Sequence, residues 1–167
     1  MIIYKQGNLL NSNCQTLVCT VNCKGVMGKG IALEFKKKFP KMFTEYRDTC
    51  LYSKTQLKQG GDLWLYRYPA LEQLTLWTPT EDGNKLITGR QSSILCFATK
   101  EHWRNLSRLD WIERGLQCVK TFVSVYCIRS IAFPKLGCSN GGLDWNDVKP
   151  LMEKYLGKMD IPVEIYV

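Results

Sequence analysis

Apolar residues along this chain follow two alternating patterns, one typical of strands and the other of helices. Short apolar and β-branched runs bounded by turn residues predict buried strands at residues 2–4, 17–21, 63–68, 94–98, 130–133 and 162–167. Between several of these runs, apolar residues return every three or four positions, which is the period of an amphipathic helix. The alternation predicts an α/β fold with a largely parallel sheet, and we expect a single domain because no repeat or low-complexity linker interrupts the chain.

The first two helices are predicted by an apolar face and by a proline. One face repeats every four residues, at Met27, Ile31, Phe35 and Phe39. Lys36–Lys38 close the last turn, where cations suit the helix dipole. Pro40 ends this helix and starts a second helical stretch that extends to about Cys50.

Capping signals predict where two later helices begin. Ser107 and Asp110 have the spacing of a capping box. The helix that would follow has an apolar side at Leu109, Ile112, Leu116, Val119 and Phe122. Asp144 is predicted to cap a further helix, with Leu143 and Val148 as a hydrophobic staple. Pro150 removes one hydrogen bond from that helix and is expected to distort its first turns.

The stretch from 71 to 90 is expected to be an insertion. Within it, residues 74–77 and 85–88 flank an Asp-Gly step at Asp82-Gly83, which favours a hairpin turn.

Length and composition narrow the class of protein. The 167 residues are 45% hydrophobic and 23% charged, which fits one folded domain and excludes intrinsic disorder and a coiled coil. No apolar run approaches the length of a membrane span, and residues 1–5 lack the features of a signal peptide. We therefore expect a cytoplasmic protein that does not engage a membrane.

The eight cysteines form no CxxC pair, and the only histidine is His102, so zinc-binding spacings cannot be assembled. In a reducing cytoplasm such thiols are expected to be small buried hydrophobic residues.

The charge balance of the chain points to an anionic ligand and not to a metal ion. Lys and Arg total 23 against 15 Asp and Glu, and a net charge of +8 favours an anionic partner such as a nucleic acid or a nucleotide.

Two loops share one design, in which a buried strand leads through glycines to the start of a helix. They lie within residues 21–31 and 133–143. Helix N-termini expose unpaired N–H groups, and glycines let the backbone approach a phosphate closely. In an open α/β sheet both loops would leave the carboxyl ends of strands, an arrangement that suits a diphosphate. The common nucleotide fingerprints do not fit, because Gly25, Gly28 and Gly30 have the wrong spacing.

Lys100 and His102 are the candidate catalytic side chains. Lys100 directly follows a predicted buried strand, and partial desolvation there would turn a lysine into a base or nucleophile, although most such lysines are solvated. His102 would have to serve any histidine-dependent mechanism, but no local signature marks a nucleophile for it. A surface or partly packed position beside Trp103 is the simpler interpretation.

The whole chain resembles the macrodomain family, which binds ADP-ribose. The resemblance depends on the segments 6–10, 21–32, 99–109 and 141–145. It implies a single macrodomain over residues 1–167, folded as a three-layer α/β/α sandwich with a mixed, largely parallel central sheet. Residues 99–109 look like the branch of DarG-type antitoxins, which removes ADP-ribose placed on thymidine in single-stranded DNA by the DarT toxin.

The resemblance also implies roles for individual residues. Asn8 would lie near the adenine, Asn22 would contact the distal ribose, and Lys100 together with Asn22 would act in catalysis. The remaining residues implied to bind ADP-ribose are Leu9, Gly28, Gly30 and Ile31 in the first half and Gly137, Ser139, Asn140, Gly141, Gly142 and Leu143 in the second loop.

One departure separates this chain from relatives that act on protein carboxylates. Those relatives pair their lysine with an aspartate in the second loop, whereas residues 139–142 here are Ser-Asn-Gly-Gly. The departure favours a hydrolase of the glycosidic linkage to DNA. The resemblance implies ADP-ribose, single-stranded DNA and a DarT-like toxin as partners. We expect a monomer without a cofactor or metal. The alternatives are a non-catalytic ADP-ribose-binding module and a hydrolase of ADP-ribosylated protein or O-acetyl-ADP-ribose.

Overall fold

The structure is a computed structural model that describes residues 1–68 and 91–167. The predicted hairpin at 74–88 and the expected insertion at 71–90 lie outside the described residues. Within them, the predicted strands all form, and each matches its expected position to within about two residues.

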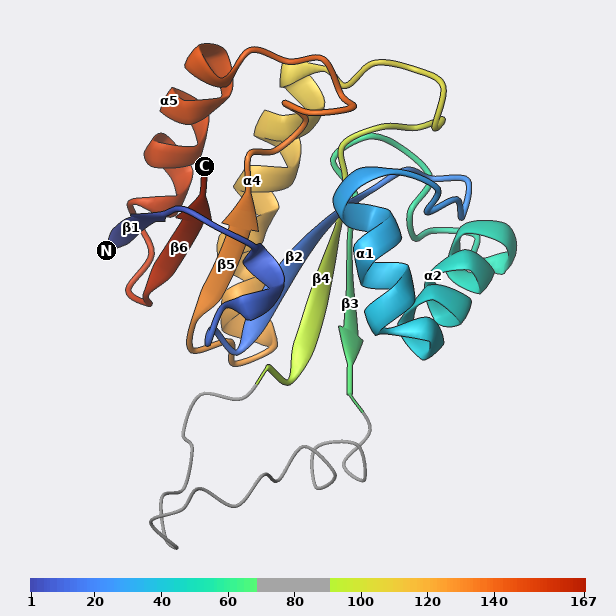
Figure 1. The fold of residues 1–167 in the computed structure, drawn as a ribbon, viewed down its shortest axis with the longest axis horizontal. Coiled ribbons are helices and arrows are strands. Elements are labelled where there is room, and N and C mark those ends of the chain that lie inside the picture. The colour runs from blue at the N-terminus through green and yellow to red at the C-terminus, as the bar shows by residue number, and fades with distance from the viewer. Residues whose placement is uncertain (69–90) are drawn as a thin grey trace, which may run out of the picture.

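The strands make one mixed sheet in the order β1-β6-β5-β2-β4-β3. Their bounds are β1 (Ile2–Lys5), β2 (Thr16–Val21), β3 (Leu63–Arg67), β4 (Ser93–Ala98), β5 (Ile131–Pro134) and β6 (Val163–Tyr166). Neighbouring strands are parallel except for β3, which pairs antiparallel with β4 at one edge. The carboxyl ends of β2, β4, β5 and β6 therefore meet at the same end of the sheet (Figure 1).

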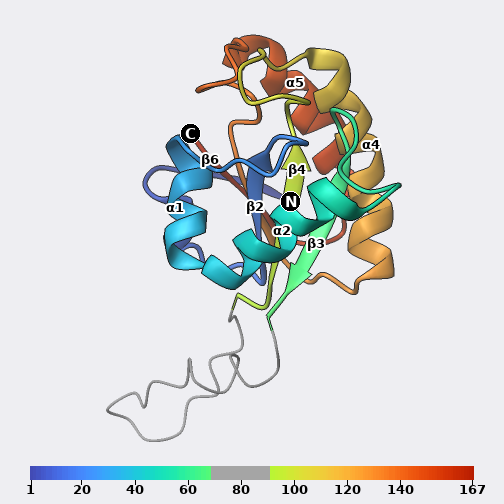
Figure 2. The same ribbon diagram turned by 90° about the vertical axis from the view of Figure 1, so that its right-hand side faces the viewer.

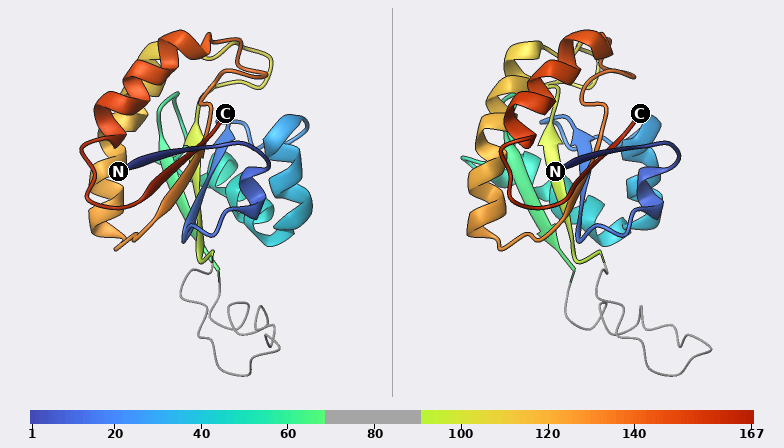
Figure 3. Two further views of the ribbon diagram at one scale, coloured as in Figure 1. Left: turned by 60° about the vertical axis from the view of Figure 1, so that its left-hand side comes forward. Right: turned by 90° about the vertical axis from the view of Figure 1, so that its left-hand side faces the viewer.

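Helices cover both faces of this sheet. Their bounds are α1 (Gly30–Lys38), α2 (Pro40–Tyr52), α4 (Leu109–Val125) and α5 (Trp145–Leu156), and a short 3-10 helix, η1, spans Leu9–Asn11. The pair α1 and α2 lies on one face, and the pair α4 and α5 lies on the opposite face (Figures 2 and 3). The architecture is the expected three-layer α/β/α sandwich.

Each face has its own hydrophobic core. On the α1/α2 side, Phe35, Met42 and Tyr46 pack with Leu17 and Cys19 of β2. On the other side, residues of α4 and α5 pack with Val18 between those two β2 positions. Since successive strand residues point to opposite faces, a strand covered on both sides is apolar throughout, which explains the continuous run in β2.

Two of the sequence predictions for helix starts are wrong. Met27 does not belong to the face of α1, because that helix begins at Gly30, although Met27 is buried from the preceding loop. Ser107 and Asp110 form no capping box. The helix α4 begins after Arg108, whose guanidinium pairs with the Asp110 carboxylate at 2.9 Å.

The other capping predictions are confirmed. The Asp144 side chain accepts a hydrogen bond from the Asn146 N–H at 2.8 Å and caps α5, and Leu143 and Val148 join the same core. The helix continues through Pro150.

Most of the cysteines are buried, but Cys118 on α4 and Cys127 in the turn that follows are exposed, so the expectation of buried thiols is wrong for these two. All eight are free thiols.

Candidate functional site

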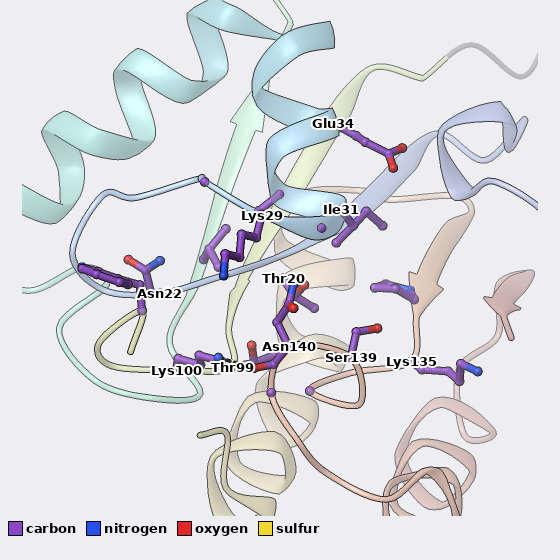
Figure 4. Close-up of a pocket in the computed structure, with 18 of the residues that line it drawn as sticks. Thr20, Asn22, Lys29, Ile31, Glu34, Thr99, Lys100, Lys135, Ser139 and Asn140 are labelled. Carbon is purple, nitrogen blue, oxygen red and sulfur yellow. Dashed lines mark hydrogen bonds between the residues drawn. The ribbon is translucent and has the colours of Figure 1, made fainter. Parts of the chain in front are cut away.

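A cavity of about 910 Å³ opens at the carboxyl ends of the central strands. Its lining includes Val21 at the end of β2, Thr99 directly after β4, Pro134 at the end of β5 and Tyr166 at the end of β6. The two glycine loops form its walls, and Lys100 lies between them (Figure 4). Parallel strands bring these segments together because their carboxyl ends share one edge of the fold.

The first loop is held in shape by the Asn22 side chain. The Asn22 amide group donates to the Val26 carbonyl oxygen at 2.7 Å, and its Oδ1 accepts from the Lys24 N–H at 2.9 Å. Tyr46 of α2 donates to the Asn22 backbone carbonyl oxygen at 2.7 Å. Asn22 is 7% exposed and lines the cavity. An amide has two N–H donors, so one remains for a ligand after the Val26 bond is made.

The first loop ends at an uncapped helix N-terminus. The Lys29 side chain does not cap α1, and Lys29, Gly30, Ile31 and Ala32 all line the cavity. The first N–H groups of a helix lack partners within it and carry a partial positive charge. This wall is therefore suited to bind an anion.

The second loop approaches so closely that it touches the first. Gly30 has a φ of +56°, which favours glycine, and a Cβ built on it would lie 2.7 Å from the Asn140 amide nitrogen, so a larger residue would displace the Asn140 side chain. Gly141 is constrained by backbone, since its Cβ would lie 2.2 Å from the Gly137 carbonyl oxygen, and also 2.4 Å from the Ser107 hydroxyl. Ser107 also donates its backbone N–H to the Gly141 carbonyl oxygen at 2.9 Å, which fixes the loop from behind.

Lys100 bridges the two walls. Its Nζ donates to the backbone carbonyl oxygen of Asn140, so the side chain points across the cavity (Figure 4). Its backbone carbonyl oxygen accepts a weak hydrogen bond from the Cys23 thiol in the first loop at 3.6 Å. Desolvation lowers the pKa of Lys100 below its ordinary value. A lysine placed in this way carries a larger neutral fraction than a solvated one.

Most of the predicted site residues line this one cavity. They are Asn8, Leu9, Asn22, Gly28, Gly30, Ile31, Lys100, Gly137, Ser139, Asn140 and Gly141. Gly142 and Leu143 are not among the lining residues. The Leu143 N–H donates to the Gly137 carbonyl oxygen at 3.0 Å and its side chain packs into the core, and Gly142 takes a φ of +76°, so both shape the loop behind the cavity.

Asn8 is also engaged in structural contacts. Its Oδ1 accepts from the Leu10 N–H at 2.9 Å and starts η1, while its amide nitrogen donates to Glu34 of α1 at 3.2 Å. Both bonds fix Asn8 at the rim of the cavity.

Several further lining residues are only weakly marked in the sequence. Lys29, Arg104 and Lys135 add positive charge beside Lys100, against one acidic lining residue, Glu34. The excess of basic residues was visible in the composition, but their gathering around one cavity depends on the fold. Trp103 also lines the cavity, and its neighbour His102 stacks on it at the surface, in keeping with the simpler interpretation of His102.

Tyr166 also lines the cavity, and nothing in the sequence marks it as a site residue, because it stands at the end of a predicted strand. Its hydroxyl donates to Glu164 at 3.1 Å, and Ser12 and Lys5 donate to the same carboxylate at 2.7 and 2.8 Å. Burial raises the pKa of Glu164, but these hydrogen bonds outweigh it and leave the pKa below its ordinary value. The charged carboxylate thus holds Tyr166 at the cavity.

Among residues 1–68 and 91–167, no cluster of His, Cys, Asp and Glu is arranged to hold a metal ion. None of the helices described there is long and apolar enough to cross a bilayer.

No family model matches this chain, but individual proteins and structures do. It is 40% identical over 163 residues to a DNA ADP-ribosyl transferase–DNA ADP-ribosyl glycohydrolase fusion protein from Thermosipho africanus, which covers 97% of this chain and 40% of that protein. The macrodomain of Thermus aquaticus DarG superposes with a TM-score of 0.83 at 34% identity, covering 100% of this chain and 98% of that one.

A structure of Thermosipho africanus DarTG in complex with ADP-ribose superposes with a TM-score of 0.82 at 37% identity, covering 99% of this chain and 41% of that one. The chain spans about two fifths of the length of the curated DNA ADP-ribosyl glycohydrolases that it matches.

Proposed function

This chain belongs to the macrodomain family, in the branch of the DarG macrodomains, and we propose that it is a glycohydrolase that removes ADP-ribose from thymidine in single-stranded DNA. The observation that carries the proposal is the position of Lys100, whose partly desolvated amine lies between the two loops suited to ADP-ribose. Similar proteins are named DNA ADP-ribosyl glycohydrolases, and one similar structure contains ADP-ribose.

The diphosphate is assigned to the gap between the two glycine loops. The uncapped N-terminus of α1 supplies N–H donors on one side, and the backbone of residues 139–141 supplies the other side. Lys29 and Lys135 add charge at the same walls. With the diphosphate there, the adenosine half would lie toward Asn8 and the distal ribose toward Asn22.

Hydrolysis breaks the bond between C1″ of the distal ribose and thymidine, adds a hydroxyl to C1″ and returns a proton to the base. A neutral Lys100 serves this reaction in one of two ways. It attacks C1″ as the thymine leaves with a proton, and water then hydrolyses the bond between Lys100 and C1″, or it removes a proton from a water molecule that attacks C1″ directly. Asn22 would orient the ribose with its remaining amide N–H. The Asn140 carbonyl oxygen keeps the lysine directed across the cavity.

Two partners follow from the same proposal. Single-stranded DNA would be attracted by the net charge of +8 and by the basic residues around the cavity. A DarT-like toxin would place the ADP-ribose that this protein removes, since the Thermosipho africanus relative joins both activities in one chain.

The test is release of ADP-ribose from a thymidine-ADP-ribosylated oligonucleotide by the wild type and by Lys100→Ala. We expect the variant to lose about 10²- to 10⁴-fold in rate, the usual contribution of an acid–base residue. Lys120→Ala, an exposed lysine on α4, is the matched control and should retain full activity.

Different results would point to the alternatives. Binding of free ADP-ribose without any release by the wild type would indicate a non-catalytic module. Release only from ADP-ribosylated protein or from O-acetyl-ADP-ribose would show that the substrate is not ADP-ribosylated DNA. An unchanged rate of ADP-ribose release in a folded Lys100→Ala variant would contradict the proposed role of Lys100.

A further inference from the structure

An exposed aromatic and basic surface lies at the mouth of the cavity and begins two residues beyond Lys100. We call it the Trp103 platform and define it as His102, Trp103, Arg104 and Leu106. Trp103 is 45% exposed and Leu106 is 68% exposed. Trp103, Arg104 and Leu106 also line the cavity, so the platform continues its wall outward.

The platform is preorganised although it is exposed. The His102 ring stacks on the Trp103 ring with a centroid separation of 5.3 Å and an angle of 25° between the planes. The Arg104 guanidinium lies 4.5 Å from the Trp103 ring centroid, and the Arg104 N–H donates to Nδ1 of His102 at 3.2 Å. These contacts restrict the indole before any ligand arrives, which lowers the entropic cost of binding.

The segment that carries the platform, residues 101–107, is anchored to the glycine loops at both ends. The Glu101 carbonyl oxygen accepts from the Cys23 N–H at 3.1 Å, and the Ser107 N–H donates to the Gly141 carbonyl oxygen at 2.9 Å. A turn closes between them, because the Asn105 N–H donates to the His102 carbonyl oxygen at 3.0 Å. The platform is therefore held at a fixed position relative to Lys100.

We propose that the Trp103 platform binds the unpaired base that neighbours the ADP-ribosylated thymidine, with Trp103 stacking on the base and Arg104 pairing with an adjacent phosphate. The inference rests on the proposed function, because it concerns the DNA on the far side of the bond that Lys100 would act on. Aromatic stacking combined with positive charge is the usual means of holding single-stranded DNA without reading its sequence.

The position of the platform favours DNA over a chance hydrophobic patch. Other exposed apolar residues, such as Tyr52 at 78% and Val125 at 66%, lie at helix ends and do not line the cavity. At the platform, exposed aromatic surface, a guanidinium and the proposed catalytic lysine occur together. A base in a duplex hides its faces, so the platform would require an unpaired one.

The first test compares two substrates for release of ADP-ribose, a single-stranded ADP-ribosylated oligonucleotide and ADP-ribosylated thymidine alone. The quantity measured is the ratio of kcat/KM for the oligonucleotide to that for the nucleoside. We expect Trp103→Ala to lower this ratio by about 5- to 150-fold, the factor that one stacked base represents. Trp103→Phe should recover part of it, and Tyr52→Ala should leave it unchanged. An unchanged ratio in Trp103→Ala would overturn the proposal.

The second test does not require activity. Fluorescence anisotropy gives the Kd of an unmodified single-stranded oligonucleotide and of its duplex. Trp103→Ala should weaken binding of the single strand by about 5- to 150-fold and leave duplex binding nearly unchanged. Equal losses on both, or no loss on either, would contradict stacking on an unpaired base. If the wild type releases no ADP-ribose from either substrate, the proposed function fails, and the anisotropy result still decides the role of the platform.

Discussion

The two glycine loops have the same design in sequence, but the structure uses them differently. The first loop is held by a side chain, Asn22, and leads to an open helix N-terminus that faces the cavity. The second loop is held by close backbone packing around Gly141 and leads to a helix already capped by Asp144. A strand followed by glycines and a helix thus predicts where a binding loop lies. The contacts that hold the loop decide which donors face the ligand.

Substitution of Gly141 should have the largest effect. A Cβ in Gly141→Ala would meet the Gly137 carbonyl oxygen and the Ser107 hydroxyl far inside contact distance, so the second loop must move. We expect a loss of about 1–3 kcal/mol in the free energy of unfolding, together with weaker binding of ADP-ribose. Urea unfolding and calorimetry measure these effects. Gly28→Ala is the control for stability, because its Cβ would meet only Val26 at 3.9 Å.

The first loop should be broken by loss of a hydrogen-bonding side chain. Asn22→Ala leaves the Val26 carbonyl oxygen and the Lys24 N–H without their partner. We expect a loss of about 1–3 kcal/mol in the free energy of unfolding. Tyr46→Phe should cost less, since the Cys50 thiol also donates to the Asn22 carbonyl oxygen. A larger loss in Tyr46→Phe would mean that α2, and not Asn22, holds the loop.

The lysine between the loops gives a pH-dependent test. Desolvation lowers the pKa of Lys100 below 10.5, and both proposed roles need the neutral amine. The neutral fraction rises with pH, so kcat/KM for ADP-ribose release should increase about tenfold per pH unit and level off below pH 10.5. A rate that falls across this range would show that the ammonium form acts instead.

The smallest expected effect concerns the cap of the second helix. Asp144→Ala removes the hydrogen bond to the Asn146 N–H and should cost about 1 kcal/mol of stability. The affinity for ADP-ribose should barely change, because α5 does not line the cavity. Asp147→Ala in the same turn keeps the cap and is the control. A strong loss of affinity in Asp144→Ala would show that both loops bind through helix N-termini.

Much of the fold could be predicted because its signals are local. Apolar runs such as 94–98 marked strands that are buried on both faces, and Pro40 and Asp144 marked helix starts. The capping box at Ser107 failed because its sequence pattern competes with a tertiary contact, in which the Ser107 N–H is bound to Gly141 of a distant loop.

The sequence by itself determined the succession of strands and helices along the chain, the two glycine loops and the place of Lys100 directly after a buried strand. Each depends on residues that are near neighbours in the chain. Only the tertiary structure decided that Asn140 accepts from Lys100, that Tyr166 reaches the cavity and that Trp103 extends its wall. These contacts depend on the order in which the parallel strands lie side by side. That order is set by long-range packing of the two cores, which no local period records.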